Sequence, residues 1–287
     1  MKAICTLTKR NMMLFFQSPT SVFFSFMAVF VVLFLYICFL GDMMIEPLKQ
    51  SFPDTAREIS DTWIMAGTLG IVSLTTSLSV LGIVIEDKSN HQVDDFYVAP
   101  ISSLQLTMAY MISTLLITMI ISYVTLAIAE IYIIAYGGAM MSMACLLKVS
   151  GVMLLSICCC TSMLYFVMSF FQSATSFSNV TTIIGTLSGF LMGIYVPVGS
   201  LPGFLQTIIA WFPPSHGAAL LRDIMMENVL QASFPAEASD ALESFKQQFG
   251  LTFAYGDHIC SNIEHLLILI AMGVVFFLFN MLRKQRK

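Results

Sequence analysis

The chain has 287 residues, of which 57% are hydrophobic and only 10% are charged, and its formal net charge at pH 7 is −4. Ordinary soluble domains carry about 25% charged residues, so this composition excludes a soluble globular protein and indicates an integral membrane protein. The sequence contains no basic patch with interleaved aromatic residues, and we therefore expect no nucleic-acid partner.

Residues 2–17 are expected to form an interfacial helix at the membrane surface. Lys9 and Arg10 fall on its polar side, whereas Ile4 and Leu7 fall on its apolar side. A basic face above an apolar face anchors a helix flat on an anionic leaflet. The alternative is an ordinary positively charged flank of the first membrane span.

Six apolar runs approach or exceed the length of about 20 residues that crosses the hydrocarbon core. We therefore predict an all-α integral membrane protein, with a single membrane domain over residues 1–287 and six transmembrane helices. The expected spans are residues 20–40, 63–85, 105–129, 149–171, 179–196 and 262–282. The polar stretch 42–62 between the first two is expected to be an aqueous loop.

The distribution of Lys and Arg predicts the orientation in the membrane. Cytoplasmic loops carry an excess of these residues, and the basic clusters that flank the spans are best accommodated with both termini inside. This orientation also places residues 86–104 in the cytoplasm. Eight basic residues are then cytoplasmic: Lys2, Lys9, Arg10, Lys88, Arg283, Lys284, Arg286 and Lys287.

Residues 86–104 form a compact polar segment between two long uncharged runs. Asp87 or Ser89 is expected to cap the start of a short helix, and Pro100 is expected to end it. Three apolar side chains then share one face, which suits docking into a separate protein. A solvated loop is the alternative. The docking set comprises Glu86, Asp87, Lys88, Val93, Asp94, Asp95, Phe96, Tyr97 and Pro100.

Residues 197–221 are apolar but are interrupted by proline and glycine every few positions. Proline kinks or breaks helices, and irregular backbone at membrane depth must be covered by protein or by a water-filled cavity. We therefore expect a re-entrant hairpin, with an extended outer loop as the alternative. Residues 222–258 should form an extracellular cap with one amphipathic helix that ends at Gly250.

No sequence motif points to catalysis or to a metal site. The chain lacks a GxxxxGK[ST] phosphate-binding loop and a metal-binding HExxH motif, so we expect neither ATP binding by this chain nor an enzyme. A bridge between Cys145 and Cys260 is possible, although cysteine in apolar runs also behaves as a small hydrophobic residue. Hydroxyls at membrane depth most often hydrogen-bond back to their own helix or across to a neighbouring helix, and the alternative is that they line a pathway. The pathway candidates are Thr75, Thr76, Ser79, Thr182 and Thr186.

Three motifs occur in an order and spacing typical of one family. They are Lys9-Arg10-Asn11 with Ser18-Pro19, then Glu86-Asp87-Lys88 through Val98-Ala99-Pro100, and finally Val196-Pro197 through Trp211-Phe212-Pro213-Pro214 with Arg222-Asp223. With these motifs the chain resembles the permease subunit of ABC-2 type transporters. The first motif is similar to the interfacial elbow helix of that family, the second to its coupling helix, and the third to its re-entrant region.

The resemblance implies an ATP-driven exporter in the bacterial cytoplasmic (inner) membrane, with a drug, peptide or lipid as substrate. It implies two copies of an ABC ATP-binding subunit that hold ATP and Mg, and a second permease chain in a homo- or heterodimer. The implied outer gate consists of Pro197, Leu201, Pro202, Phe204, Leu205 and Phe212. An ion-coupled carrier or channel without an ATPase is the alternative, and a membrane scaffold is a third reading.

Overall fold

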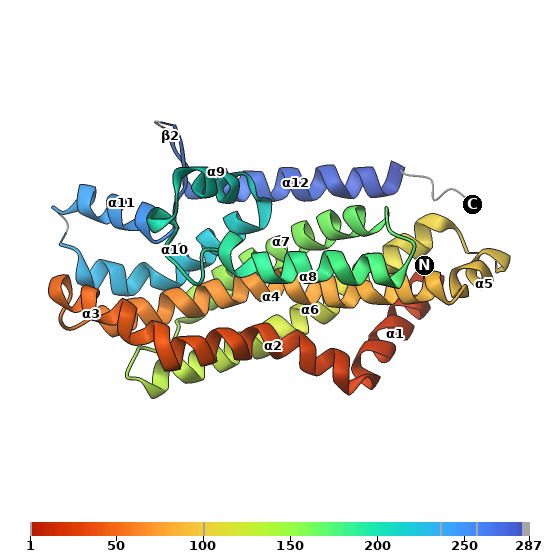
Figure 1. Ribbon diagram of the computed structural model, residues 1–287, viewed down its shortest axis with the longest axis horizontal. Coiled ribbons are helices and arrows are strands. Elements are labelled where there is room, and N and C mark those ends of the chain that lie inside the picture. The colour runs from red at the N-terminus through yellow and green to blue at the C-terminus, as the bar shows by residue number, and fades with distance from the viewer. Residues whose placement is uncertain (1, 100, 236, 257, 283–287) are drawn as a thin grey trace.

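Long helices that run side by side account for most of the chain in the computed structural model (Figure 1). The structure describes residues 2–99, 101–235, 237–256 and 258–282. The first part of the chain forms α1 (Lys2–Gln17), α2 (Pro19–Leu35), the π-helix η1 (Tyr36–Leu40), α3 (Gly41–Ser51), α4 (Ala56–Ser89), α5 (Gln92–Val98) and α6 (Ser103–Ala135). The second part forms α7 (Met143–Met168), α8 (Ala174–Leu191), the 3-10 helix η2 (Val198–Ser200), α9 (Gly203–Trp211), α10 (Pro213–Ser233), α11 (Ser239–Gln248), β1 (Ala254–Tyr255), β2 (His258–Ile259) and α12 (Asn262–Leu282).

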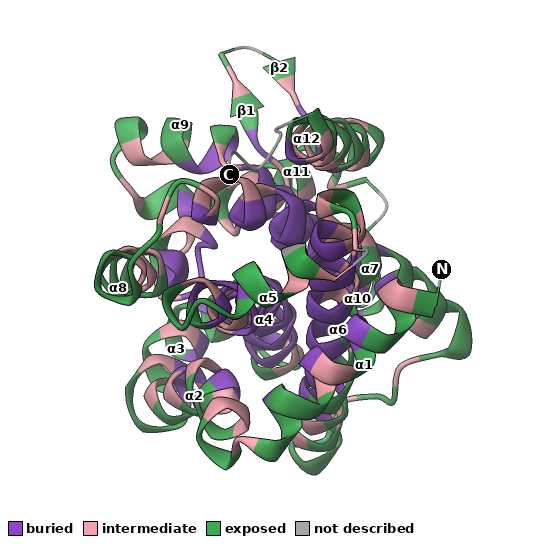
Figure 2. Ribbon diagram, turned by 90° about the vertical axis from the view of Figure 1, so that its right-hand side faces the viewer, coloured by how far each residue is buried: buried purple, intermediate pink, exposed green. Residues whose placement is uncertain are grey.

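Helix α4 lies at the centre of the bundle (Figure 2). It contacts α2, α3, α6, α7, α8 and α10, and every residue from Ile59 to Leu74 is buried. Glycine permits the closest of these contacts, because a Cβ atom on Gly70 would lie 2.8 Å from the Cβ atom of Ala218 in α10. The other helices are therefore arranged around one buried rod.

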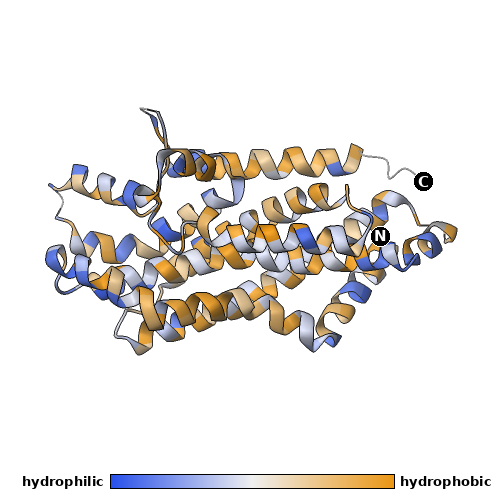
Figure 3. Ribbon diagram, in the orientation of Figure 1, coloured by the Kyte–Doolittle hydropathy of each residue, from blue (hydrophilic) through white to orange (hydrophobic). Residues whose placement is uncertain are grey.

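Five helical segments of the described chain are long and apolar enough to cross a membrane, and Figure 3 shows their hydrophobic middle parts. They are Pro19–Ser51, Ala56–Ser89, Ser103–Ala135, Met143–Met168 and Asn262–Leu282. Four of the expected spans lie within these segments, and a fifth, 149–171, overlaps Met143–Met168 but extends three residues beyond it. The remaining expected span corresponds to α8, which has 18 residues and is not among the five. The nearly all-α, multi-pass fold class is confirmed.

Residues 42–62, which the sequence predicts as an aqueous loop, are mostly helical. The π-helix η1 carries α2 directly into α3, and α4 already begins at Ala56. Asp61 is buried in this region, where Tyr36 donates a 2.6 Å hydrogen bond to its carboxylate and Arg57 lies 3.5 Å away. A distant partner, Tyr36, and a partner one helical turn away, Arg57, thus compensate the burial of an acid that the sequence pattern assigns to water.

Helix α10 changes the expected organisation of the segment before the last helix. Its first two residues are Pro213 and Pro214, at positions where a missing backbone donor costs nothing. The helix then continues to Ser233 and packs against α4, α7 and α12. The expected division between a hairpin over 197–221 and a cap over 222–258 therefore falls inside one buried helix. The amphipathic helix expected in the cap is α11, and Gly250 follows it at φ +67°.

All seven cysteines are free thiols, so the possible Cys145–Cys260 bridge is not formed. The sulfur of Cys145 instead lies 3.6 Å from the carbonyl oxygen of Ile224. Helices α1 and α5 lie at one end of the bundle, together with the last residues of α12, whereas α3, α11 and the β1–β2 hairpin lie at the other end (Figure 1).

Candidate functional site

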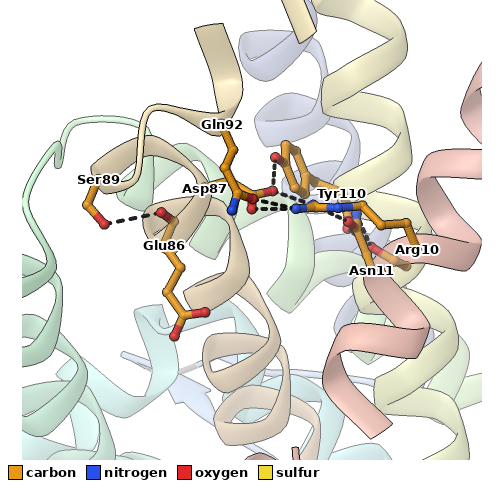
Figure 4. A network of polar contacts seen from close by, with 8 residues as sticks. Arg10, Asn11, Glu86, Asp87, Ser89, Gln92 and Tyr110 are labelled. Carbon is orange, nitrogen blue, oxygen red and sulfur yellow. Dashed lines mark hydrogen bonds and ion pairs between the residues drawn. The ribbon is translucent and has the colours of Figure 1, made fainter. Parts of the chain in front are cut away.

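The end of α4 meets α1, α5 and the beginning of α6 at one end of the bundle (Figure 4). Helix α1 has the expected bounds, and Ser18 caps the following helix while Pro19 occupies its first position. The buried residues of α1, Leu7 and Phe15 among them, belong to the core. This helix therefore lies against the bundle and brings its polar side chains to the end of α4.

The short helix α5 begins later than the sequence predicts. The helical hydrogen bonds of α4 continue through Ser89, and the chain then turns at His91, which has the left-handed backbone conformation with φ 59°. Neither Asp87 nor Ser89 is therefore the cap of this helix. At its other end Ala99 is extended, as expected for a residue before proline. Pro100 itself lies outside the described residues.

Asp87 forms the centre of a buried polar network, although the sequence assigns it to a docking surface. Its side chain is 4% exposed and lies 2.6 Å and 2.8 Å from the two terminal nitrogens of Arg10. The hydroxyl of Tyr110, from α6, donates a third hydrogen bond of 2.6 Å. A two-point pair with arginine is strong and directional, and it offsets the cost of burying the carboxylate.

Arg10 also contacts α5, which follows Asp87 in the chain. Its guanidinium donates a 2.6 Å hydrogen bond to the side chain of Gln92, at the start of α5, and lies 5.3 Å from the ring centre of Phe96. The hydrogen bond to Asp87 raises the pKa of the Arg10 guanidinium, which stays charged. One arginine of α1 thus contacts the end of α4 and two residues of α5, Gln92 and Phe96.

Asn11 extends this network to α6. As a polar residue on the apolar side of α1, it does not fit the amphipathic pattern of that helix. In the structure it is buried and donates a 3.2 Å hydrogen bond to the hydroxyl of Ser113, while its oxygen accepts a 3.1 Å bond from Arg10. Asn11 therefore has a hydrogen-bond partner in α6, which explains why a polar side chain is tolerated on the apolar side of α1.

The surface that α5 offers to a partner differs from the expected one. Val93 is buried and Phe96 is partly buried against the core, so both side chains face the bundle. Val98 is 90% exposed, and Glu86, Asp94 and Asp95 are also exposed. The side chain of Tyr97 lies outside the description, and Lys88 is half-buried. The free surface of the segment is therefore acidic, with one apolar side chain at its end.

The residues expected to form an outer gate lie around α9, near the end of the bundle opposite α5. Pro197 precedes η2 and Pro202 precedes α9, while Leu201 packs against a small buried cluster that contains Val198 and Phe253. Phe204 is exposed, and Leu205 and Phe212 are partly buried. The structure thus brings these residues to one region.

The hydroxyl residues expected along a pathway lie on α4 and α8, which contact each other. The hydroxyls of Thr75, Thr182 and Thr186 donate to backbone carbonyls four residues earlier in their own helices. Thr76 is fully buried, and within the described residues its hydroxyl has no hydrogen-bond partner, whereas Ser79 is half-buried. Thr182 and Thr186 are exposed on the free side of α8.

Sequence reasoning missed Tyr110 and Arg222. Arg222 is buried in α10, donates hydrogen bonds of 2.8 and 2.9 Å to the carbonyls of Met192 and Gly193, and lies 4.8 Å from the ring centre of Trp63. The sequence signal for Arg222 is its position directly after the apolar run 218–221, because arginine is rarely fully buried unless it has partners. Tyr110 gives no comparable signal, because tyrosine is common in apolar segments.

Comparisons with known proteins agree with this arrangement. A family model described as "ABC-2 family transporter protein" matches residues 45–282, which include every span after the first and the whole segment around α5. No curated protein sequence matches the chain.

Proposed function

Since the chain belongs to the ABC-2 transporter family, we propose that it exports a small or amphipathic substrate, such as a drug, a peptide or a lipid, by using ATP hydrolysis in a partner. The family consists of membrane subunits that are not themselves ATPases, and it implies an ABC transporter with an ATP-binding partner. In the proposed assembly two permease chains form the path, and two ATP-binding subunits hold ATP and Mg.

One observation carries this proposal, namely that α5 protrudes from the bundle but is fixed to it through Arg10. A helix of seven residues is about 10 Å long, which is too small to form a domain but large enough to enter a cleft. Val93, Phe96 and Gln92 hold it against the body, while Asp94, Asp95 and Val98 are exposed. A displacement of α5 would therefore be transmitted to α1 and α4.

ATP binding to the partner subunits would favour one conformation of this chain over the other. The partner subunits would move together when they bind ATP, and each would carry one α5 with it. A ligand can shift a two-state element only by the difference in its affinity for the two states, so the contact between α5 and the partner must differ between them. The acidic side chains of α5 suit charge-assisted contacts with basic groups of the partner.

The membrane arrangement proposed here has six spans, with α8 as the fifth in sequence order. An 18-residue helix is about 27 Å long, close to the hydrocarbon thickness of about 30 Å. The end of the bundle that carries α1 and α5 would face the cytoplasm of a bacterial cell. The segment around α9 would enter the outer leaflet and act as the gate, and the hydroxyls of α4 and α8 would line the path.

Co-purification with the ATP-binding subunit tests the proposal, and Val98→Asp is the decisive variant. The substitution changes a side chain that is 90% exposed, so the bundle itself should fold and insert as before. We expect loss of the complex and of substrate-stimulated ATP hydrolysis. Phe96→Asp is less informative, because Phe96 also packs against Arg10 and the core of its own chain.

Met140→Asp is the matched control, because Met140 is also exposed and lies beyond the opposite end of α6. This variant should keep the complex. If Val98→Asp retains full binding and full transport, α5 is not the docking element. Transport that continues in ATP-depleted vesicles with an ion gradient would instead identify an ion-coupled carrier.

A further inference from the structure

A crevice of about 290 Å³ opens between α6, α7 and α12. All three helices are among the candidate membrane spans, so in the proposed membrane arrangement bilayer hydrocarbon would surround the crevice. Its lining is apolar except for Thr161 and Ser162, and it includes two flexible methionines of α6. Representative lining residues are Met108, Met111, Leu155, Cys158, Val274 and Phe277.

The crevice lies in the half of the bundle that carries α5. Its α6 residues, 108–115, begin five positions after the start of that helix, which corresponds to a depth of about 8 to 18 Å. The α7 residues, 155–162, lie in the second half of a helix that runs in the opposite direction. A leaflet contributes about half of the 30 Å hydrocarbon thickness, so the crevice adjoins the acyl chains of the leaflet on the α5 side.

The crevice is small, because its volume lies near the lower limit of about 300 Å³ for ordinary ligand pockets. Two polar groups at the crevice have partners inside the protein. The hydroxyl of Thr161 lies 3.5 Å from that of Ser77, and the carbonyl of Ser162 accepts a 2.8 Å hydrogen bond from Asn280. The crevice is therefore a narrow and mainly apolar site.

We propose that this crevice binds one acyl chain of a bilayer phospholipid from the leaflet on the α5 side. Its volume is near the lower limit of ordinary ligand pockets, which suits a single chain. The methionines allow the lining to adapt to chains of different length and saturation. The inference depends on membrane insertion alone, so it can succeed or fail independently of ATP-driven export.

Photo-crosslinking of the full-length protein tests this site. The protein is reconstituted in phosphatidylcholine vesicles that contain a phospholipid with a diazirine in the middle of one acyl chain, and the crosslinked peptides are identified by mass spectrometry. We expect crosslinks to concentrate on the lining segments of α6, α7 and α12. Excess unlabelled phospholipid should reduce them, because a defined site saturates.

Two pairs of adjacent residues provide matched variants. Leu155 lines the crevice, whereas Leu154 is exposed on the same helix, and Val274 lines it whereas Val275 is exposed next to it. Leu155→Trp and Val274→Trp should lower the crosslinking yield at least about tenfold, which is the effect of excluding two buried methylene groups. Leu154→Trp and Val275→Trp should leave it unchanged. Because Val274 is itself half exposed, its variant tests the site even if Leu155→Trp fails to fold.

Two results would overturn the proposal. One is an even distribution of crosslinks over the exposed residues of all spans, with no effect of the filling variants. The other is labelling of the crevice by a diazirine detergent but not by the phospholipid, which would identify an adventitious additive only.

Discussion

Arg10 and Asp87 are 77 positions apart in the sequence and form a two-point ion pair, in which both terminal nitrogens of the arginine contact a carboxylate oxygen at 2.6 and 2.8 Å. The pair joins a helix at the edge of the bundle to the end of its central buried helix. Two parallel hydrogen bonds fix the orientation of the groups as well as their distance. The position of α5 is therefore coupled to that of α1.

Replacement of Arg10 by lysine should break this coupling while retaining the charge. Lysine presents a point charge and cannot form the planar two-point contact. We expect a loss of roughly 1.5–3 kcal/mol of unfolding free energy, the value of one hydrogen bond to a charged group. Thermal unfolding of the purified chain measures the loss of stability. Substrate-stimulated ATP hydrolysis in the complex measures the coupling between α5 and α1. Lys9→Ala, at the exposed neighbouring position, should leave both values unchanged.

Tyr110→Phe removes one of the three hydrogen bonds to Asp87 without changing the shape of the side chain. The carboxylate stays buried with one donor fewer, so the bundle should be destabilised by about 1.5–3 kcal/mol. Tyr123→Phe on the same helix is the control, because Tyr123 is 41% exposed. Equal unfolding midpoints for the two variants would show that the Tyr110 hydroxyl contributes nothing to the network.

Gly70→Ala should separate α4 from α10. The new methyl group would lie 2.8 Å from the Cβ atom and 3.3 Å from the Cα atom of Ala218, and these atoms cannot move aside without shifting a helix. Overpacking of this kind costs about 1–3 kcal/mol. At Gly151 an added methyl group meets no atom within 4 Å, so Gly151→Ala should be neutral or slightly stabilising. A difference in thermal unfolding midpoints between these variants checks the packing.

Arg222→Lys should loosen the contacts that α10 makes with the chain after α8 and with Trp63. A lysine ammonium cannot reproduce both the two hydrogen bonds to the end of α8 and the contact with the Trp63 ring. We expect a loss of at least about 1.5–3 kcal/mol and faster proteolysis between α10 and α12. Lys148→Met, which breaks an exposed ion pair with Glu227, should change stability by less than about 1 kcal/mol. Similar proteolysis of both variants would contradict this role of Arg222.

Features with a local cause were predictable from the sequence. The helix over residues 2–17 follows from its amphipathic pattern and from the Ser18-Pro19 pair that starts the next helix. The end of α11 at Gly250 follows from the need for a positive φ angle. Periodicity and capping depend on neighbours within a few positions, and the sequence contains all of that information.

Features that depend on distant partners were not predictable. Asp87 resembles other surface acids until Arg10 and Tyr110 are placed beside it. Asp61 likewise appears in a polar stretch, and only its bond from Tyr36 explains its burial in a helix. Val93 and Phe96 share one side of α5, but the sequence contains no information on whether that side faces a partner or the chain itself.

By itself the sequence determined that this protein is helical, crosses the membrane several times and belongs with the ABC-2 permeases, because composition, periodicity and the order of motifs are properties of the chain alone. Only the tertiary structure decided which polar residues point inward, since a buried charge is stable only where a distant residue supplies its partner. The pairing of Arg10 with Asp87 is of that kind.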